Sequence, residues 1–177
     1  NYELGYKAEL LDRTLRINAA VFYMDWEDLQ VAFQESGVDA DGEFFIFGGI
    51  DNAESASSYG AELSLTALPI DRLVVNFNVG YLKAEFDKFV AFIDGENRIL
   101  DGETIPNSPE WTVSADAEYS FPISAGLDAF VRGEYIYRDS LRSTTAALIQ
   151  EGFPREVPSY DYINLRLGLE EAFFISS

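Results

Sequence analysis

Apolar and polar residues alternate with a period of two along most of this chain, and the spacing typical of an amphipathic helix does not recur. In the first such segment Tyr2, Leu4 and Tyr6 lie on one face of the expected strand, with Glu3 and Lys7 on the other. The same alternation returns along the sequence, which predicts an all-β fold of about seven to eight strands. The clearest segments are 2–10, 15–23, 59–67, 73–81, 111–121, 126–137 and 160–169.

The connections between these segments are alternately short and long. All short turns would then lie at one edge of the sheet, as in outer-membrane barrels, where periplasmic turns are short and extracellular loops are long. We therefore expect an antiparallel up-and-down meander that is part of a transmembrane β-barrel, with residues 1–177 forming a single barrel segment. The expected short turns lie near 12–14, 69–72 and 122–125, and the long loops near 27–58, 87–110 and 138–159.

Composition narrows the class of protein further. Hydrophobic residues make up 47% of the chain and the mean hydropathy is -0.06, which suits a barrel wall as well as a globular domain. No stretch approaches the roughly 18 consecutive apolar residues that a transmembrane helix needs. The aromatic share of 15% favours strands and, in a bilayer, interfacial girdles.

The missing residue types exclude several kinds of chemistry. The sequence contains no Cys and no His, so disulfides, Cys/His zinc sites and His-dependent triads are excluded. We therefore expect no enzyme activity and no resident cofactor. The net charge of -19 argues against nucleic acid as a partner and is compatible with cations or a metal-bearing ligand. The chain enters a strand pattern directly at Asn1 without a signal peptide, so we expect this start to be internal to a longer protein.

Residues 27–58 contain many acidic side chains and no Lys or Arg, the strongest local charge imbalance in the chain. Two interpretations stay open: a mouth that concentrates cations or cationic ligands, and a loop that its charge keeps solvated. Aromatic residues in this stretch could bind an apolar part of a ligand, or they could pack against other loops or the bilayer interface. The candidate ligand-binding residues are Glu35, Asp39, Asp41, Glu43, Phe44 and Phe45.

A calcium site is a further hypothesis for the same stretch. The run Asp39-Ala40-Asp41-Gly42-Glu43 clusters the carboxylates that hard cations prefer, although its spacing does not follow the EF-hand loop. Asp39, Asp41 and Glu43 are therefore candidate ligands of a divalent cation such as calcium.

Aromatic residues at the ends of the expected strands would lie at the level of the lipid headgroups. On the polar face of one strand, Asp116 and Glu118 are better explained as lining of a lumen than as an acid–base pair, because a pair of that kind needs a pocket. The candidate membrane-interface aromatics are Tyr23, Trp26, Tyr81, Trp111, Tyr119 and Tyr137.

Several stretches of the sequence resemble the barrels of TonB-dependent outer-membrane receptors. The resemblance spans nearly the whole chain, keeps the family's order and corresponds to the C-terminal part of the barrel, without the plug. The stretches that carry it are 2–9 with 15–23, 52–63, and Ile105-Pro106-Asn107-Ser108-Pro109 ahead of the strand that begins at Trp111.

This resemblance implies a barrel of about 22 strands with an N-terminal plug, in the bacterial outer membrane. It implies import of iron–siderophore complexes, cobalamin or other large solutes with energy relayed by TonB. The implied partners are outer-membrane lipid, the plug domain, TonB and a small-molecule or metal-chelate solute. The sequence lacks the plug and the family's closing strand after Ser177, so we expect a fragment of the barrel.

Two other functions stay open: a passive porin-like barrel without TonB coupling, and a soluble all-β binding module whose apolar face is a protein core. A fragment of about seven strands has open edges, which invite pairing with other strands. Closure into a smaller barrel and oligomerisation are both open ways to cover them.

Overall fold

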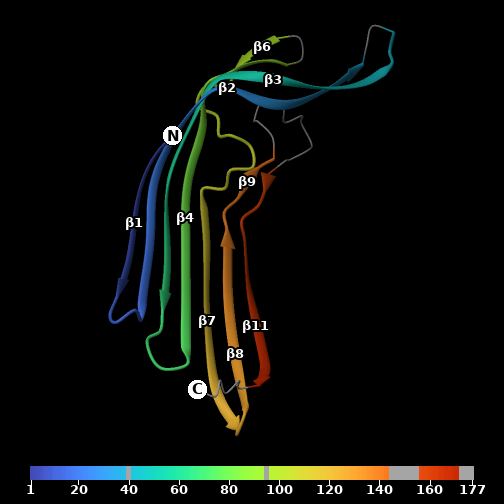
Figure 1. Ribbon diagram of the computed structural model, residues 1–177. Coiled ribbons are helices and arrows are strands. Elements are labelled where there is room, and N and C mark those ends of the chain that lie inside the picture. Colours follow the sequence, from blue (N-terminus) through green and yellow to red (C-terminus); the bar gives the residue numbers. More distant parts are fainter. Residues whose placement is uncertain (39–40, 94–95, 144–155, 172–177) are drawn as a thin grey trace.

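The computed structural model describes residues 1–38, 41–93, 96–143 and 156–171 (Figure 1). Seven strands form one antiparallel sheet, and each pairs with the next of the seven along the chain, which confirms the predicted all-β meander. In sheet order they are β1 (Tyr2–Leu10), β2 (Leu15–Val38), β3 (Phe44–Ala67), β4 (Leu73–Lys88), β7 (Trp111–Ser124), β8 (Leu127–Arg138) and β11 (Tyr160–Glu171).

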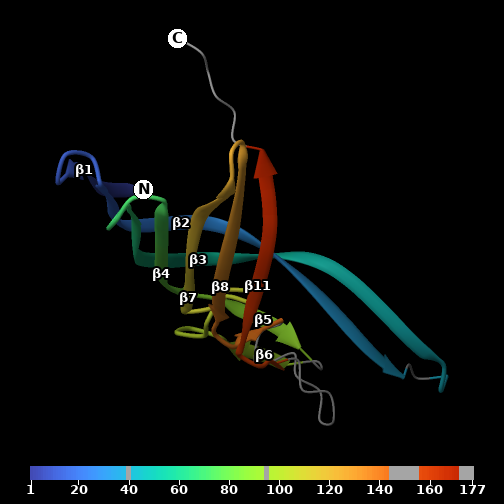
Figure 2. The ribbon, with the colours of Figure 1, turned by 90° about the horizontal axis from the view of Figure 1, so that it is seen from below.

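The sheet curves from β1 to β11 without closing on itself (Figure 2). Among the described residues, β1 and β11 are its two edges. Both edges therefore present backbone groups that no strand of the described chain pairs with. No described segment forms a helix that is long and apolar enough to cross a membrane.

The three tight turns lie at one end of the sheet and the longer connections at the other (Figure 1). The turn before β2 places Asp12 and Arg13 in the left-handed region, with φ of 53° and 70°. In the turn before β4, Arg72 also lies in the left-handed region, with φ of 66°. The third turn lies later than the expected 122–125, because β7 continues to Ser124 and the chain reverses at Gly126, with φ 82°.

The long loop expected near 27–58 is instead a hairpin, and that prediction was wrong. β2 and β3 stay paired up to Val38 and Phe44, so the hairpin projects far beyond the sheet (Figures 1 and 2). Asp28 is skipped by the pairing and has a φ of 54°. Residues 44–50 read FFIFGGI, and their aromatic and β-branched side chains favour a strand despite the acidic residues around them.

The other two long connections also contain strands. Within 87–110, β5 (Val90–Ile93) pairs with β6 (Glu96–Ile99). Within 138–159, β9 (Leu141–Arg142) pairs with β10 (Glu156–Val157).

After β6 the chain returns along the end of β4. The Phe86 amide donates to the Glu103 carbonyl at 2.9 Å, and the Ile105 amide donates to the Ala84 carbonyl at 3.0 Å. Arg142 of β9 binds the same segment, through an ion pair of 3.3 Å with Glu103. The two connections are therefore tied to each other and to β4.

A small apolar core lies at this end of the sheet, and Phe86 is its largest fully buried side chain. Outside it, many large apolar side chains are exposed, for example Ile163 at 76% and Leu165 at 72%. The apolar face of the sheet is therefore not a protein core in the described chain. The core consists of Ala53, Ala56, Phe86, Phe89 and Leu100, with Leu29 and Ile105 packed against them.

Candidate functional site

One face of the sheet is apolar from strand to strand. Its residues are those that the period-two pattern selects, such as Val21 on β2, Leu63 on β3, Val79 on β4 and Leu167 on β11. From the Trp111 level to the tight turns, the positions of this face on β1, β2, β3, β4, β7 and β8 hold no Asp, Glu, Lys or Arg, and on β11 the same is true from Ile163 to Leu169. We call this surface the outer face.

Aromatic residues mark the two ends of the outer face. Near the long connections, the ring centroids of Tyr81 and Trp111 lie 4.8 Å apart, and those of Tyr59 and Tyr81 lie 6.5 Å apart. Near the tight turns, Tyr119 stacks on Phe121 with centroids 6.1 Å apart. The segment from Trp111 to Tyr119 spans roughly 26 Å along β7, or roughly 20 Å across a membrane after strand tilt, close to the height of a barrel's apolar band.

Most of the predicted interface aromatics take part in these two levels. Tyr23 pairs with Tyr59 in the register of β2 and β3, and Tyr137 lies at the end of β8, where its hydroxyl donates to Asp139 at 3.3 Å. Tyr59 was missed from the sequence, although it begins one of the alternating segments and therefore carried a signal.

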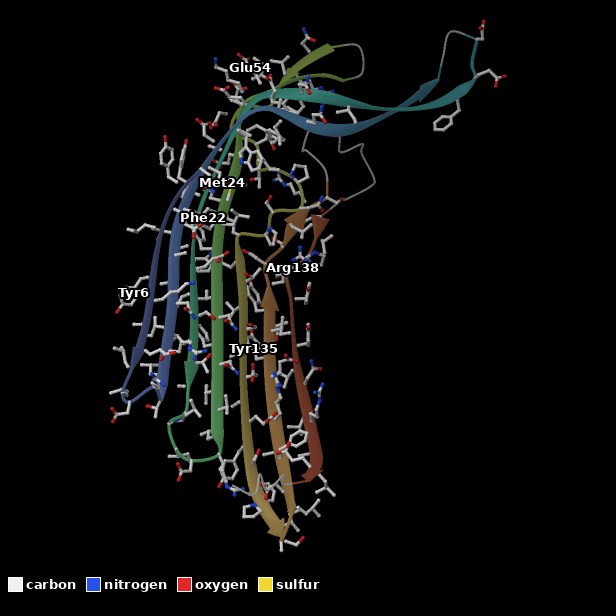
Figure 3. The ribbon with its side chains drawn as sticks, in the orientation of Figure 1. Tyr6, Phe22, Met24, Glu54, Tyr135 and Arg138 are labelled. Atoms are coloured by element: carbon white, nitrogen blue, oxygen red, sulfur yellow. The ribbon has the colours of Figure 1, made fainter. Side chains whose placement is uncertain are left out.

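Trp26 lies on the other face, contrary to its predicted place in the girdle. The pairing of β2 with β3 runs without a shift from Leu15 to Glu27, so Trp26 shares a face with Phe22 and Met24, which Figure 3 labels. Its register partner is the buried Ala56. Proximity to the strand end suggested a girdle position, whereas the alternation itself assigns Trp26 to the inside.

The opposite surface, which we call the inner face, is polar and joined by side-chain hydrogen bonds. Thr66 Oγ1 donates to Asn76 Oδ1 at 3.0 Å, and Asn76 Nδ2 donates to Asp116 Oδ2 at 3.1 Å. Arg132 lies 3.4 Å from Asp116 and 3.9 Å from Glu118. The two carboxylates thus belong to a network that connects four strands, as the sequence indicated for a lumen wall.

The network continues toward both edges of the sheet. Asn164 on β11 donates to Glu134 on β8 at 2.9 Å, and Arg16 on β2 pairs with Glu9 on β1 at 3.0 Å. Ion pairs and amide bonds of this kind cross-link neighbouring strands, so they hold the register of the wall.

Nearer the long connections, the inner face is hollowed by a groove of about 590 Å³. Small residues such as Gly80 and Thr112 lie between Glu62 and Arg138, which belong to the same register row of four strands. We call this hollow the inner groove.

Five of the six predicted ligand-binding residues lie in the described part of the projecting hairpin. Asp41 and Glu43 lie exposed at its tip, and Phe44 is 68% exposed. Glu35 and Phe45 are strand residues of β2 and β3.

Asp39 lies outside the described residues, so the calcium site stays a prediction. In the described ranges, no three carboxylates gather in a way that could hold a metal ion.

Comparison with known proteins agrees with this geometry. The family model for the TonB dependent receptor-like β-barrel matches residues 1–173. Comparison with curated proteins gives no match.

Among solved structures, the chain is similar to three receptors of Acinetobacter baumannii. They are the siderophore receptor PiuA (21% identity, TM-score 0.62), the ferric preacinetobactin receptor BauA (17%, 0.61) and the siderophore receptor PirA (20%, 0.59). The matches cover 92%, 92% and 94% of this chain but only 21%, 21% and 24% of the receptors, and at these identities they show the fold. The chain belongs to the TonB-dependent receptor-like β-barrel family, whose members are outer-membrane proteins.

Proposed function

We propose that this chain is a sector of the barrel wall of a receptor that imports a scarce nutrient, such as an iron–siderophore complex, in a TonB-dependent manner. The observation that carries the proposal is the division of one curved sheet into a charge-free outer face and a hydrogen-bonded inner face. A siderophore complex as solute is supported by the fold that the chain shares with two siderophore receptors and a ferric preacinetobactin receptor. Because the chain spans about a fifth to a quarter of their length, the activity is proposed for the complete receptor.

In this proposal the outer face contacts lipid. Lipid removes the exposed aliphatic side chains from water, and each buried Leu or Ile contributes about 1.5–3 kcal/mol. Between its two edge strands the sheet satisfies its own backbone groups, which is what a spanning structure in lipid requires. The aromatic levels at Trp111 and Tyr119 lie where lipid headgroups would meet them.

The inner face has a different role, because its polar groups need partners inside the barrel. The bonds of Asn76, Asp116 and Arg132 satisfy one another within the wall. Glu62 and Arg138, which line the inner groove outside this network, face the space where a plug domain or a passing solute would lie. The projecting hairpin, at the end of the long connections, is the part that reaches farthest toward a solute outside the cell.

Uptake by cells that carry the complete receptor as their sole route for the solute tests the proposal. Radioactive ferric siderophores, cobalamin and oligosaccharides would be supplied with and without a protonophore, which removes the energy that TonB relays. We expect uptake of a ferric complex that stops with the protonophore. Uptake that is insensitive to the protonophore and covers small solutes in general would contradict the proposal and support a passive porin.

The same cells also separate the receptor from a soluble module. The receptor should fractionate with the outer membrane and need detergent for extraction. A chain that is monomeric and folded in plain buffer would exclude the membrane assignment.

A further inference from the structure

The inner groove ends in a group of side chains that the wall itself does not use. Arg138 closes β8 and is half-buried, and its Nε is shielded from water without a hydrogen-bond partner among the described residues. Figure 3 shows Arg138 at the end of β8 nearest the long connections. By contrast, Arg132 on the same face is bound by two carboxylates of β7. Arg138 is therefore a cation that the network leaves available.

One tyrosine lies beside this cation, and a second tyrosine stacks on the first. Tyr160 pairs with Arg138 in the register of β8 and β11, and Tyr162 follows it on the same face. Their rings stack with centroids 6.2 Å apart and planes at 11°, and they are 44% and 43% exposed. They lie on the inner face, so they do not belong to the lipid girdle. Such a pair offers a flat ring surface on which another aromatic ring can stack.

The rest of the groove determines which ligands fit. Its floor between the two charged ends is made of Gly80, which has no side chain, and Thr112, whose side chain is short, so the space stays open. Glu62 lies three strands from Arg138 in the same row, or roughly 14 Å away at the usual strand spacing, too far to pair with it. One end therefore attracts anions and the other repels them.

We infer that Arg138, Tyr160 and Tyr162 form a solute subsite on the inner wall that takes an aromatic ring carrying anionic oxygens, such as a catecholate or hydroxybenzoate group. The guanidinium is a planar fork of donors that matches a pair of neighbouring oxygens, and the tyrosines stack on the ring that bears them. Chelating groups of this kind carry iron, so the inference rests on the proposed function and specifies its substrate class. The subsite lies below the long connections, where a solute would pass after leaving the hairpin.

Equilibrium binding to the complete receptor in outer-membrane vesicles tests the subsite without requiring transport. The probes are the radioactive ferric complex of 2,3-dihydroxybenzoate and, as a complex without an aromatic ring, ferric desferrioxamine B. Arg138→Gln and Tyr160→Leu should each weaken binding of the aromatic complex at least tenfold, about 1.4 kcal/mol. Tyr160→Phe keeps the ring and should retain the affinity.

Tyr135→Leu is the matched control, because Tyr135 lies on the outer face of β8 at 38% exposure and cannot contact the groove. It should bind the aromatic complex like the unmodified receptor. Heat-modifiable gel mobility confirms that each variant is folded before binding is measured.

Three results would overturn the inference: unchanged affinity in Arg138→Gln and Tyr160→Leu, no binding of the aromatic complex by the unmodified receptor, or an equal loss for the hydroxamate complex. Energised uptake of another ferric complex would leave the proposed function standing in each case. Conversely, absence of any energised uptake would contradict the proposed function. The binding experiment with the aromatic complex would still test the subsite in that case.

Discussion

Replacing Leu165 by Arg places a charge at the middle of the outer face. Leu165 lies four residues from Asp161 and four from Leu169 on β11, so it is roughly 13 Å along the strand from either end of the apolar band. Its side chain is 72% exposed in the described chain and packs in no core. In a bilayer midplane, an Arg on the lipid face of a barrel destabilises folding by about 2–4 kcal/mol.

Asn164→Arg is the matched control, because the preceding residue points to the inner face. Asn164 binds Glu134, and an Arg there keeps a carboxylate partner in reach. We therefore expect Asn164→Arg to change the unfolding free energy by much less than Leu165→Arg. Two adjacent positions then receive the same side chain, and only the face differs.

The assay is urea titration of the complete receptor folded in lipid vesicles, followed by heat-modifiable gel mobility. A water-exposed surface position away from special features changes stability by about 0.5 kcal/mol or less on substitution. A Leu165→Arg effect in that range, or a larger loss for Asn164→Arg, would refute the assignment of the two faces.

Three further predictions follow from contacts within the sheet. Gly60→Ala should destabilise the receptor by about 1–3 kcal/mol, because a Cβ there would overlap the backbone carbonyl oxygen of Tyr81 on β4. At Gly133 a Cβ meets nothing within 4 Å, so Gly133→Ala should be close to neutral in the same urea titration. Asp116→Ala removes an acceptor that Arg132 and Asn76 share, and it should reduce the unfolding free energy by about 1–3 kcal/mol. Asp116→Asn should reduce the unfolding free energy less, and equal losses in the two variants would contradict the network. Brominated lipids should quench the fluorescence of Trp111, which is obtained by difference from the Trp111→Phe variant, and should leave the fluorescence of Trp26 unchanged. Equal quenching of the two residues would show that Trp26 faces lipid.

Much of the sheet could be predicted from the sequence, because the alternation of apolar and polar residues shows which residues of a barrel strand share a face. The alternation alone places Leu63, Val79 and Leu165 on the apolar face, and the structure confirms the strands that contain them. The order of the strands also followed, since short turns leave a meander as the simplest connection.

Other features needed pairing between distant residues. Acidic residues suggested a loop at 27–58, but strand propensity and continuous pairing with the facing strand extend β2 and β3 through it. The inner groove combines Glu62 and Arg138, which are far apart in the sequence, and only the register of four strands brings them into one row. Similarly, only the pairing of β8 with β11 shows that Arg138 and Tyr160 are neighbours.

A spin-label scan along β11 of the complete receptor in lipid vesicles tests the central claim, that this sheet is a membrane wall with one lipid face. Single labels at positions 162 to 169 would be compared for collisions with oxygen, which concentrates in lipid, and with a water-soluble nickel chelate. We predict a period of two, with oxygen access highest at 163, 165, 167 and 169 and lowest at the positions between them. A profile without alternation, or nickel access that is highest at 163, 165, 167 and 169, would contradict the account.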